Sequence, residues 1–150
     1  MEALKVAIAD DNESMLKVLG QVIGQEQDLS VVGTATNGED TFHIIKEKEP
    51  DVVLLDIIMP QIDGLTVMEK VHKDKEIRKT PAFIIISAIG RDSVTEDAFN
   101  MGASYYIMKP FDNDMLINRI RYIRNVHAEN TKAGAAPALE HTVVSDRNLE

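Results

Sequence analysis

The sequence predicts an α/β fold in which five β-strands alternate with five α-helices as a (βα)5 unit. Short apolar segments recur between Leu4 and Met108, and the stretches between them carry apolar residues at helical spacing. Two of these segments, 51–56 and 82–87, are apolar on consecutive residues, which is typical of strands covered on both faces. Repeated strand–helix alternation favours one parallel sheet with right-handed crossovers.

Five segments are predicted as strands because each is short and rich in apolar residues. The second is the weakest, and the third and fourth contain the clearest sequences, Val52–Leu55 and Phe83–Ile86. The predicted strands are residues 4–9, 30–35, 51–56, 82–87 and 104–108.

Five amphipathic helices are predicted from apolar residues that recur three or four positions apart. Asp11 or Asn12 is positioned to cap the first helix. The second must end before Pro50, and Gly102 is expected just past the end of the fourth. The apolar stripes are Met15, Leu19, Val22 and Ile23; Phe42 and Ile45; Leu65, Met68 and Val71; Val94, Ala98 and Met101; and Leu116, Ile120, Ile123 and His127.

The chain is expected to form one domain over residues 1–127, followed by a linker or tail over residues 128–150. It has 150 residues, of which 44% are hydrophobic, and this is enough for a full core. From Ala128 onward apolar periodicity is weak, and residues 133–138 are rich in alanine and contain Gly134 and Pro137. Such a linker suggests that the natural protein continues past Glu150 into an effector domain.

Composition excludes several classes of protein. The chain has no cysteine, so disulfides and thiolate metal sites are ruled out. No apolar segment approaches the ~20 residues of a membrane span, and no secretory signal is recognised, so a cytoplasmic location without a membrane partner is expected. A net charge of −9 argues against DNA binding by these residues, and the arginines of segment 119–124 fit a solvated helix face better.

Polar residues stand where four of the predicted strands end. In an open parallel sheet, ligands bind beyond the carboxyl ends of the strands. Three carboxylates, a hydroxyl and an ammonium should therefore meet at one edge. The residues concerned are Asp10 and Asp11 after the first strand, Asp56 at the third, Ser87 and Ala88 at the fourth, and Lys109 after the fifth.

The three carboxylates indicate a site for a divalent metal ion. Clustered carboxylates repel one another, and a hard cation that prefers oxygen ligands removes the conflict. Asp10 and Asp11 are candidate ligands, one directly and the other through water, and Asp56 can add a further ligand. Mg²⁺ is the expected ion, with Mn²⁺ as a substitute and Ca²⁺ as an occupant in a crystal.

Asp56 is also a candidate nucleophile, since carboxylate attack on phosphorus gives an aspartyl-phosphate. Lys109 would supply a positive charge to one phosphoryl oxygen, and Ser87 would donate a hydrogen bond to another. The backbone N–H of Ala88 is a further candidate donor. Phosphoryl transfer needs little beyond such positioning and charge stabilisation.

Each of these residues has a structural explanation when it is taken alone. Asp10 or Asp11 could cap a helix, Asp56 could belong to a turn, and Lys109 could be a surface lysine. A flavin protein with a similar sheet is disfavoured, because two adjacent aspartates would repel its phosphate without a metal. A phosphatase with an aspartate nucleophile would usually carry a second acid where Ile58 stands. The occurrence of these residues together, at the ends of four strands, favours phosphoryl acceptance.

The sequence resembles the receiver domain of bacterial two-component response regulators over residues 1 to about 127. The resemblance implies a flavodoxin-like, doubly wound parallel sheet with strand order 2-1-3-4-5. The matching segments are Ala9-Asp10-Asp11-Asn12, Leu55-Asp56-Ile57-Ile58-Met59-Pro60, Asp63-Gly64, Ser87-Ala88, Gly102-Ala103-Ser104 and Lys109-Pro110-Phe111.

The resemblance also implies roles for individual residues at the metal site. Asp56 would be phosphorylated by a histidine kinase or a histidine phosphotransfer protein. Asp10 and Asp11 match the acidic metal pair of the family, and Ile58 matches the position whose backbone carbonyl binds the metal. Lys109 matches the family's lysine, whose bond to the following proline is cis in such domains.

Two further residues match the switch of the family, the hydroxyl at Ser87 and the aromatic at Tyr106. Phosphorylation is expected to draw Ser87 toward the phosphoryl group and to move Tyr106 inward, which would reshape the face formed by the fourth helix, fifth strand and fifth helix. Ile58 and Ile89 are apolar and cannot orient an attacking water, so slow self-dephosphorylation is expected.

In their individual residues, these segments resemble the receivers of the sporulation master transcription factors of endospore-forming Firmicutes. This implies control of sporulation transcription, with DNA bound only through a C-terminal domain outside these residues. The alternative is a stand-alone phosphorelay carrier. A phosphatase and, on phosphorylation, a second copy of the chain are further expected partners. No enzyme activity is expected beyond the chain's own phosphorylation and dephosphorylation.

Overall fold

Strands and helices alternate along the chain in the computed structural model, which describes residues 2–133 and 142–144. The helices are α1 (Glu13–Gly24), α2 (Gly38–Lys48), α3 (Gly64–Lys73), α4 (Asp92–Asn100) and α5 (Asn113–Ala133). The strands are β1 (Leu4–Ala9), β2 (Leu29–Ala35), β3 (Val52–Leu55), β4 (Ala82–Ser87), β5 (Ala103–Met108) and β6 (Thr142–Val144).

All strands belong to one parallel sheet with the order β2-β1-β3-β4-β5-β6. The predicted α/β class and the order 2-1-3-4-5 of the first five strands are therefore confirmed. β3 and β4 are buried along their whole length, as their consecutive apolar residues predicted.

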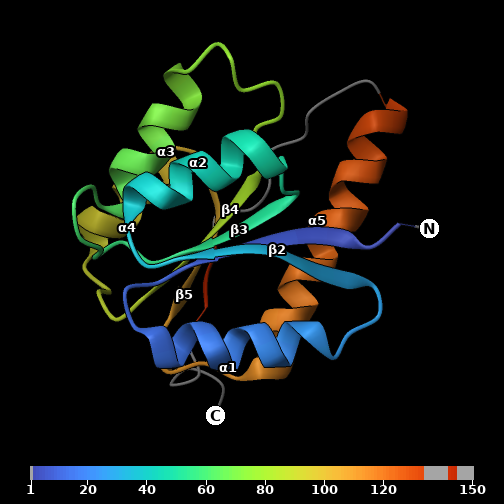
Figure 1. The fold of residues 1–150 in the computed structure, drawn as a ribbon, viewed down its shortest axis with the longest axis horizontal. Helices are drawn as coiled ribbons and strands as arrows, with labels where there is room; N and C mark the ends of the chain where they lie inside the picture. Colours follow the sequence, from blue (N-terminus) through green and yellow to red (C-terminus); the bar gives the residue numbers. More distant parts are fainter. Residues whose placement is uncertain (1, 134–141, 145–150) are drawn as a thin grey trace.

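The sheet separates two hydrophobic clusters, because side chains on a strand alternate between its faces. One cluster joins the sheet to α1 and α5 through residues such as Leu19, Ile23 and Ile120. The other joins it to α2, α3 and α4 through residues such as Ile45 and Met68. Figure 1 shows α2 and α3 on one side of the sheet and α1 on the other.

The helix ends explain how the chain turns at the two edges of the sheet, after β1 and before β5. Asn12 is the cap of α1, and its side-chain oxygen accepts hydrogen bonds from the N–H groups of Ser14 and Met15. This leaves the two preceding aspartates outside the helix. At the end of α4, Gly102 follows the cap residue with φ of 105°, a left-handed conformation that glycine adopts without strain.

The C-terminal region differs from the prediction in two respects. α5 continues to Ala133 instead of ending near His127, because the first glycine of this region is Gly134 and no earlier residue breaks a helix. The short strand β6 was not predicted, since three residues are too few to show a strand period. The boundary between the domain and a linker stays a prediction.

No helix in the described ranges combines the length and the apolar character that crossing a bilayer requires.

Candidate functional site

The residues predicted to form the site stand together at the carboxyl edge of the sheet. Asp10 directly follows β1, Asp56 follows β3, Ser87 is the last residue of β4, and Lys109 follows β5. Backbone hydrogen bonds continue the sheet into these positions. The Asp56 N–H donates to the carbonyl of Ala9 at 2.9 Å, and the Lys109 N–H donates to the carbonyl of Ser87 at 2.9 Å.

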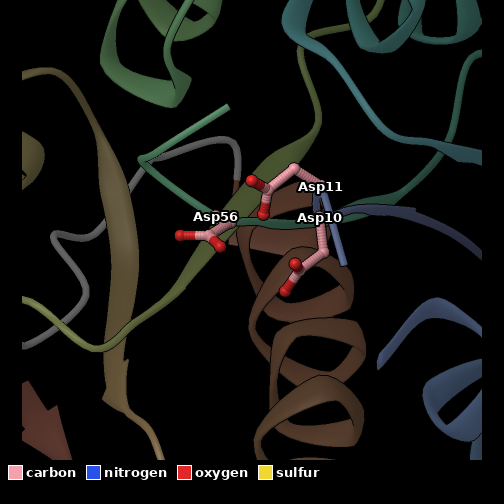
Figure 2. Close-up of side chains that lie close together, drawn as sticks. All are labelled: Asp10, Asp11 and Asp56. Atoms are coloured by element: carbon pink, nitrogen blue, oxygen red, sulfur yellow. The ribbon is translucent and has the colours of Figure 1, made fainter. Parts of the chain in front are cut away.

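Three carboxylates gather at this edge, as Figure 2 shows. One oxygen each of Asp10, Asp11 and Asp56 lies within 4.8 Å of the others. Asp10 and Asp56 are 2% and 7% exposed, whereas Asp11 is exposed to solvent. The backbone N–H of Asn12 donates to Asp10 Oδ1 at 2.9 Å, so the first turn of the loop fixes the orientation of that carboxylate.

Lys109 reaches into the cluster and contacts two of the carboxylates. Its Nζ lies 2.7 Å from Asp10 Oδ2 and 3.2 Å from Asp56 Oδ2. Burial favours the neutral amine, but the hydrogen bond that Lys109 donates to Asp10 and the charge of Asp56 outweigh it and raise the pKa of Lys109. The lysine is therefore held as a cation, and its bond to Pro110 is cis, as the resemblance implied.

The electrostatics of the cluster fit a divalent metal ion. Burial is the largest cause that raises the pKa of Asp56, and the charge of Asp10 adds to it, while Lys109 opposes both. Three carboxylates and one ammonium leave two excess negative charges. Hard oxygen donors with this excess charge suit Mg²⁺, which binds through a few carboxylates and keeps several waters.

The loop after Asp56 is held by the start of α3. Gly64 donates its N–H to the carbonyl of Ile57 at 2.8 Å, and a Cβ on Gly64 would overlap the Asp56 carbonyl oxygen. The side chain of Asp63 caps the helix by accepting from the Thr66 N–H at 2.8 Å. The sequence identified Asp63 and Gly64 only as a segment that matches the family, and it did not reveal that Gly64 positions the Asp56 backbone.

The predicted switch residues are connected through Ile89. The backbone N–H of Ile89 donates to Ser87 Oγ at 3.1 Å, and the hydroxyl of Tyr106 donates to the Ile89 carbonyl. Tyr106 is 0% exposed and packs edge-on against Phe99 of α4. Burial raises the pKa of the Tyr106 hydroxyl, so it stays a hydrogen-bond donor at neutral pH.

The movement that was expected of Tyr106 on phosphorylation stays a prediction. Tyr106 was expected to move inward on phosphorylation, but its side chain is already fully buried in this conformation. Ser87 Oγ accepts from the Ile89 N–H, so its own hydrogen can be donated to another acceptor.

The remaining predicted residues flank the cluster. Ile58 donates its N–H to Asp56 Oδ1 at 3.3 Å, and its side chain is 59% exposed. Ala88 is exposed beside Ser87, and Ile89 is half-buried. Two apolar residues therefore stand next to the site in the chain, Ile58 in the loop after β3 and Ile89 in the loop after β4.

The sequence matches known proteins over most of its length. A family model, the response regulator receiver domain, matches residues 6–121. The chain is 27% identical to the response regulator domain of CheB from Thermotoga maritima, with a TM-score of 0.74 and coverage of 83% of this chain and 98% of that one.

Two further solved structures are similar. One is a CheX–CheY–BeF3–Mg²⁺ complex from Borrelia burgdorferi, with 30% identity, a TM-score of 0.73, and coverage of 82% of this chain and 90% of that one. The other is a DNA-binding response regulator of the LuxR family from Staphylococcus aureus, with 28% identity, a TM-score of 0.74, and coverage of 81% and 99%. The family match spans β1 to α5 and includes every residue of the acidic cluster and its lysine, so this chain belongs to the response regulator receiver domain family.

Proposed function

We propose that this receiver accepts a phosphoryl group on Asp56 and thereby switches the output of a two-component or phosphorelay response regulator. The observation that carries the proposal is the position of the Asp56 carboxylate, which is buried beside two other carboxylates and contacts the Lys109 ammonium at 3.2 Å. A structural aspartate does not need a metal-type cluster, whereas a phosphoryl acceptor needs both the cluster and the cation.

Side chains of this chain provide the nucleophile and most of the groups that hold the phosphoryl oxygens. An oxygen of Asp56 attacks the phosphorus of the donor and forms a new P–O bond, while the bond to the leaving group breaks and the leaving group keeps the electron pair. Lys109 holds one phosphoryl oxygen, and Ser87 can donate its hydroxyl hydrogen to another. Mg²⁺ held by Asp10, Asp11 and Asp56, with the Ile58 carbonyl as a further ligand, would neutralise charge on the phosphoryl oxygens.

Partners follow from this chemistry. The donor is a histidine kinase or a histidine phosphotransfer protein, and a phosphatase removes the phosphoryl group. The complex of the Borrelia relative with CheX, BeF3 and Mg²⁺ supports both a Mg²⁺ ion and a protein partner for this chain. The receiver is not an enzyme toward other substrates, and its cytoplasmic location and dimerisation on phosphorylation stay predictions.

For the output we propose sporulation transcription, on the resemblance of the segments around Asp10, Asp56 and Tyr106. DNA would be bound only by a C-terminal domain outside these residues. The DNA-binding relative from Staphylococcus aureus supports such an output for a receiver of this likeness. A stand-alone phosphorelay carrier is the alternative.

The experiment that tests acceptance uses the 150-residue chain, acetyl phosphate and Mg²⁺. Intact-protein mass spectrometry should show the gain of one phosphoryl group, which hydroxylamine removes because it cleaves acyl phosphates. A chelator should prevent the gain, since the carboxylate cluster then repels the donor. A chain that stays unmodified in the presence of Mg²⁺, or that is modified equally well with the chelator, would contradict the proposal.

A long lifetime of the phosphoryl group is expected from the two apolar side chains that follow Asp56 and Ser87. Ile58 and Ile89 cannot hold a water in line with the phosphorus, so hydrolysis lacks a positioned proton acceptor. The double variant Ile58→Gln/Ile89→Gln should shorten the half-life by about tenfold, a fraction of what an optimised acceptor provides. The decay is followed by mass spectrometry after removal of the donor.

The matched control for this experiment is Val18→Gln, which replaces another exposed apolar residue, 49% exposed, on α1. It should leave the half-life unchanged. If the double variant decays at the wild-type rate, the two apolar side chains are not what protects the phosphoryl group.

A further inference from the structure

The outer edge of β5 is occupied by β6, a strand contributed by the chain beyond α5. The two strands are parallel, with Tyr105 opposite Thr142, Tyr106 opposite Val143 and Ile107 opposite Val144. Without β6, β5 would be an edge strand, and every second residue would present an unpaired N–H and C=O outward. β6 therefore covers the backbone of the strand that carries Tyr106.

β5 is the strand through which the site contacts both layers of helices. The backbone of Tyr106 lies between Ile85 of β4 and Val143 of β6, and its hydroxyl is bonded to Ile89 beside Ser87. The side chain of the preceding residue, Tyr105, points to the opposite face of the sheet and packs against Tyr122 of α5. A shift of β5 is therefore transmitted to Ile89 on one side and to β6 on the other.

We propose that the outer edge of β5 is a strand-docking surface whose occupant is the chain's own segment Thr142–Val144. The docked segment ties the chain that follows Val144 to the strand carrying Tyr106, so the position of that chain depends on the state of the site. The docking is independent of phosphorylation, whereas its coupling to Asp56 rests on the proposed function.

The topology favours the chain's own segment over a second copy. A parallel strand requires a crossover connection, usually a helix, and α5 supplies it between β5 and β6. Residues 134–141 are the only chain between the end of α5 and β6, and a short tether gives its segment an effective concentration of about 1 mM. A second copy of the chain at micromolar concentration is far more dilute than the attached segment, so it does not compete for the edge of β5.

The short length of the segment suits a reversible contact. A three-residue strand forms few backbone hydrogen bonds, and the entropy lost in ordering it offsets most of what those bonds contribute. Docked and undocked states then differ little in free energy, so a small change in β5 redistributes them. A partner that adds a strand at this edge would have to displace the segment.

The docking is tested by amide hydrogen exchange, measured by NMR on the 150-residue chain and on Val143→Pro. Proline has no N–H and fixes φ, so it disrupts the short strand. The outward-facing amides of Tyr105–Ile107 should exchange about tenfold faster in the variant. The amides that pair with β4 should keep their protection, which shows that the fold is intact. The control, Asn148→Pro, introduces proline outside β6. It should change the exchange rates of neither the outward-facing amides of β5 nor the amides that pair with β4.

Two results would overturn the docking. One is equal exchange of the β5 amides in the wild type and in Val143→Pro. The other is protection that falls on dilution in parallel with a dimer, which would assign the segment to a second copy of the chain.

The coupling is tested on the wild-type chain with beryllofluoride and Mg²⁺, which mimic the phosphoryl group. Displacement of β5 should make the amides of Thr142–Val144 exchange at least about threefold faster. Unchanged exchange, with the mimic visibly bound next to Asp56, would overturn the coupling. Failure of the mimic to bind would overturn the proposed function and the coupling together, whereas the docking stands on the measurement without the mimic.

Discussion

Asp56→Asn is expected to abolish phosphoryl transfer from acetyl phosphate to the chain. The amide is a far weaker nucleophile than the carboxylate and provides no charge for the metal, so the rate should fall by at least about a thousandfold. Intact-protein mass spectrometry in the presence of Mg²⁺ would show no added phosphoryl group under conditions that modify the wild type fully. Full modification of the variant would show that another residue is the acceptor.

The matched control for this loss is Asp63→Asn. Asp63 lies in the loop that follows Asp56 and caps α3, and asparagine caps a helix as well as aspartate does. Its phosphorylation should equal that of the wild type.

Loss of folding is not expected to explain the effect of Asp56→Asn. The pKa of Asp56 is raised in the folded chain, so its ionised form costs stability at any pH above that pKa. Without metal at neutral pH, the variant should unfold at a temperature no lower than the wild type.

Lys109→Met is expected to separate metal binding from phosphoryl transfer. The ammonium would hold a phosphoryl oxygen, and loss of one such group aimed at developing charge typically costs about 100- to 1000-fold in rate. Metal binding should not weaken, because removal of the ammonium increases the excess negative charge of the three carboxylates from two to three. Isothermal titration calorimetry with Mg²⁺ and the rate of modification by acetyl phosphate measure the two effects.

Lys79→Met is the control for losing a lysine–carboxylate pair. Lys79 pairs with Asp51, which precedes β3, whereas Asp56 follows β3. This variant should keep both properties of the wild type, apart from a small loss of stability. If Lys109→Met lost Mg²⁺ binding and phosphorylation in equal measure, Lys109 would be a structural residue and its proposed role would fail.

The sequence predicted the residues of the site better than their arrangement. Asp10, Asp56 and Lys109 were placed together because parallel strands end at one edge, and this follows from the strand assignments alone. That Lys109 lies closer to Asp10 than to Asp56 depends on side-chain packing that no spacing reveals. The strand order came from the family resemblance, because strand–helix alternation is compatible with several orders.

Three features could not be predicted for identifiable reasons. Tyr106 is already buried, because its rotamer depends on Phe99 and on the Ile89 carbonyl, which lie on other elements. The close approach of Gly64 to Asp56 is a contact between α3 and the end of β3. β6 depends on a pairing partner distant in sequence, and local propensity does not identify such partners.

The separation of 99 residues between Asp10 and Lys109 has a consequence for the order of events during synthesis. Asp10, Asp11 and Asp56 all precede α3, so a growing chain contains the whole carboxylate cluster long before it contains β5. A ribosome-bound chain at that stage lacks the Lys109 ammonium that contacts Asp10 and Asp56, and β4 also lacks its neighbour β5. Under the proposed function, the chain becomes able to accept a phosphoryl group only after Lys109 has left the exit tunnel.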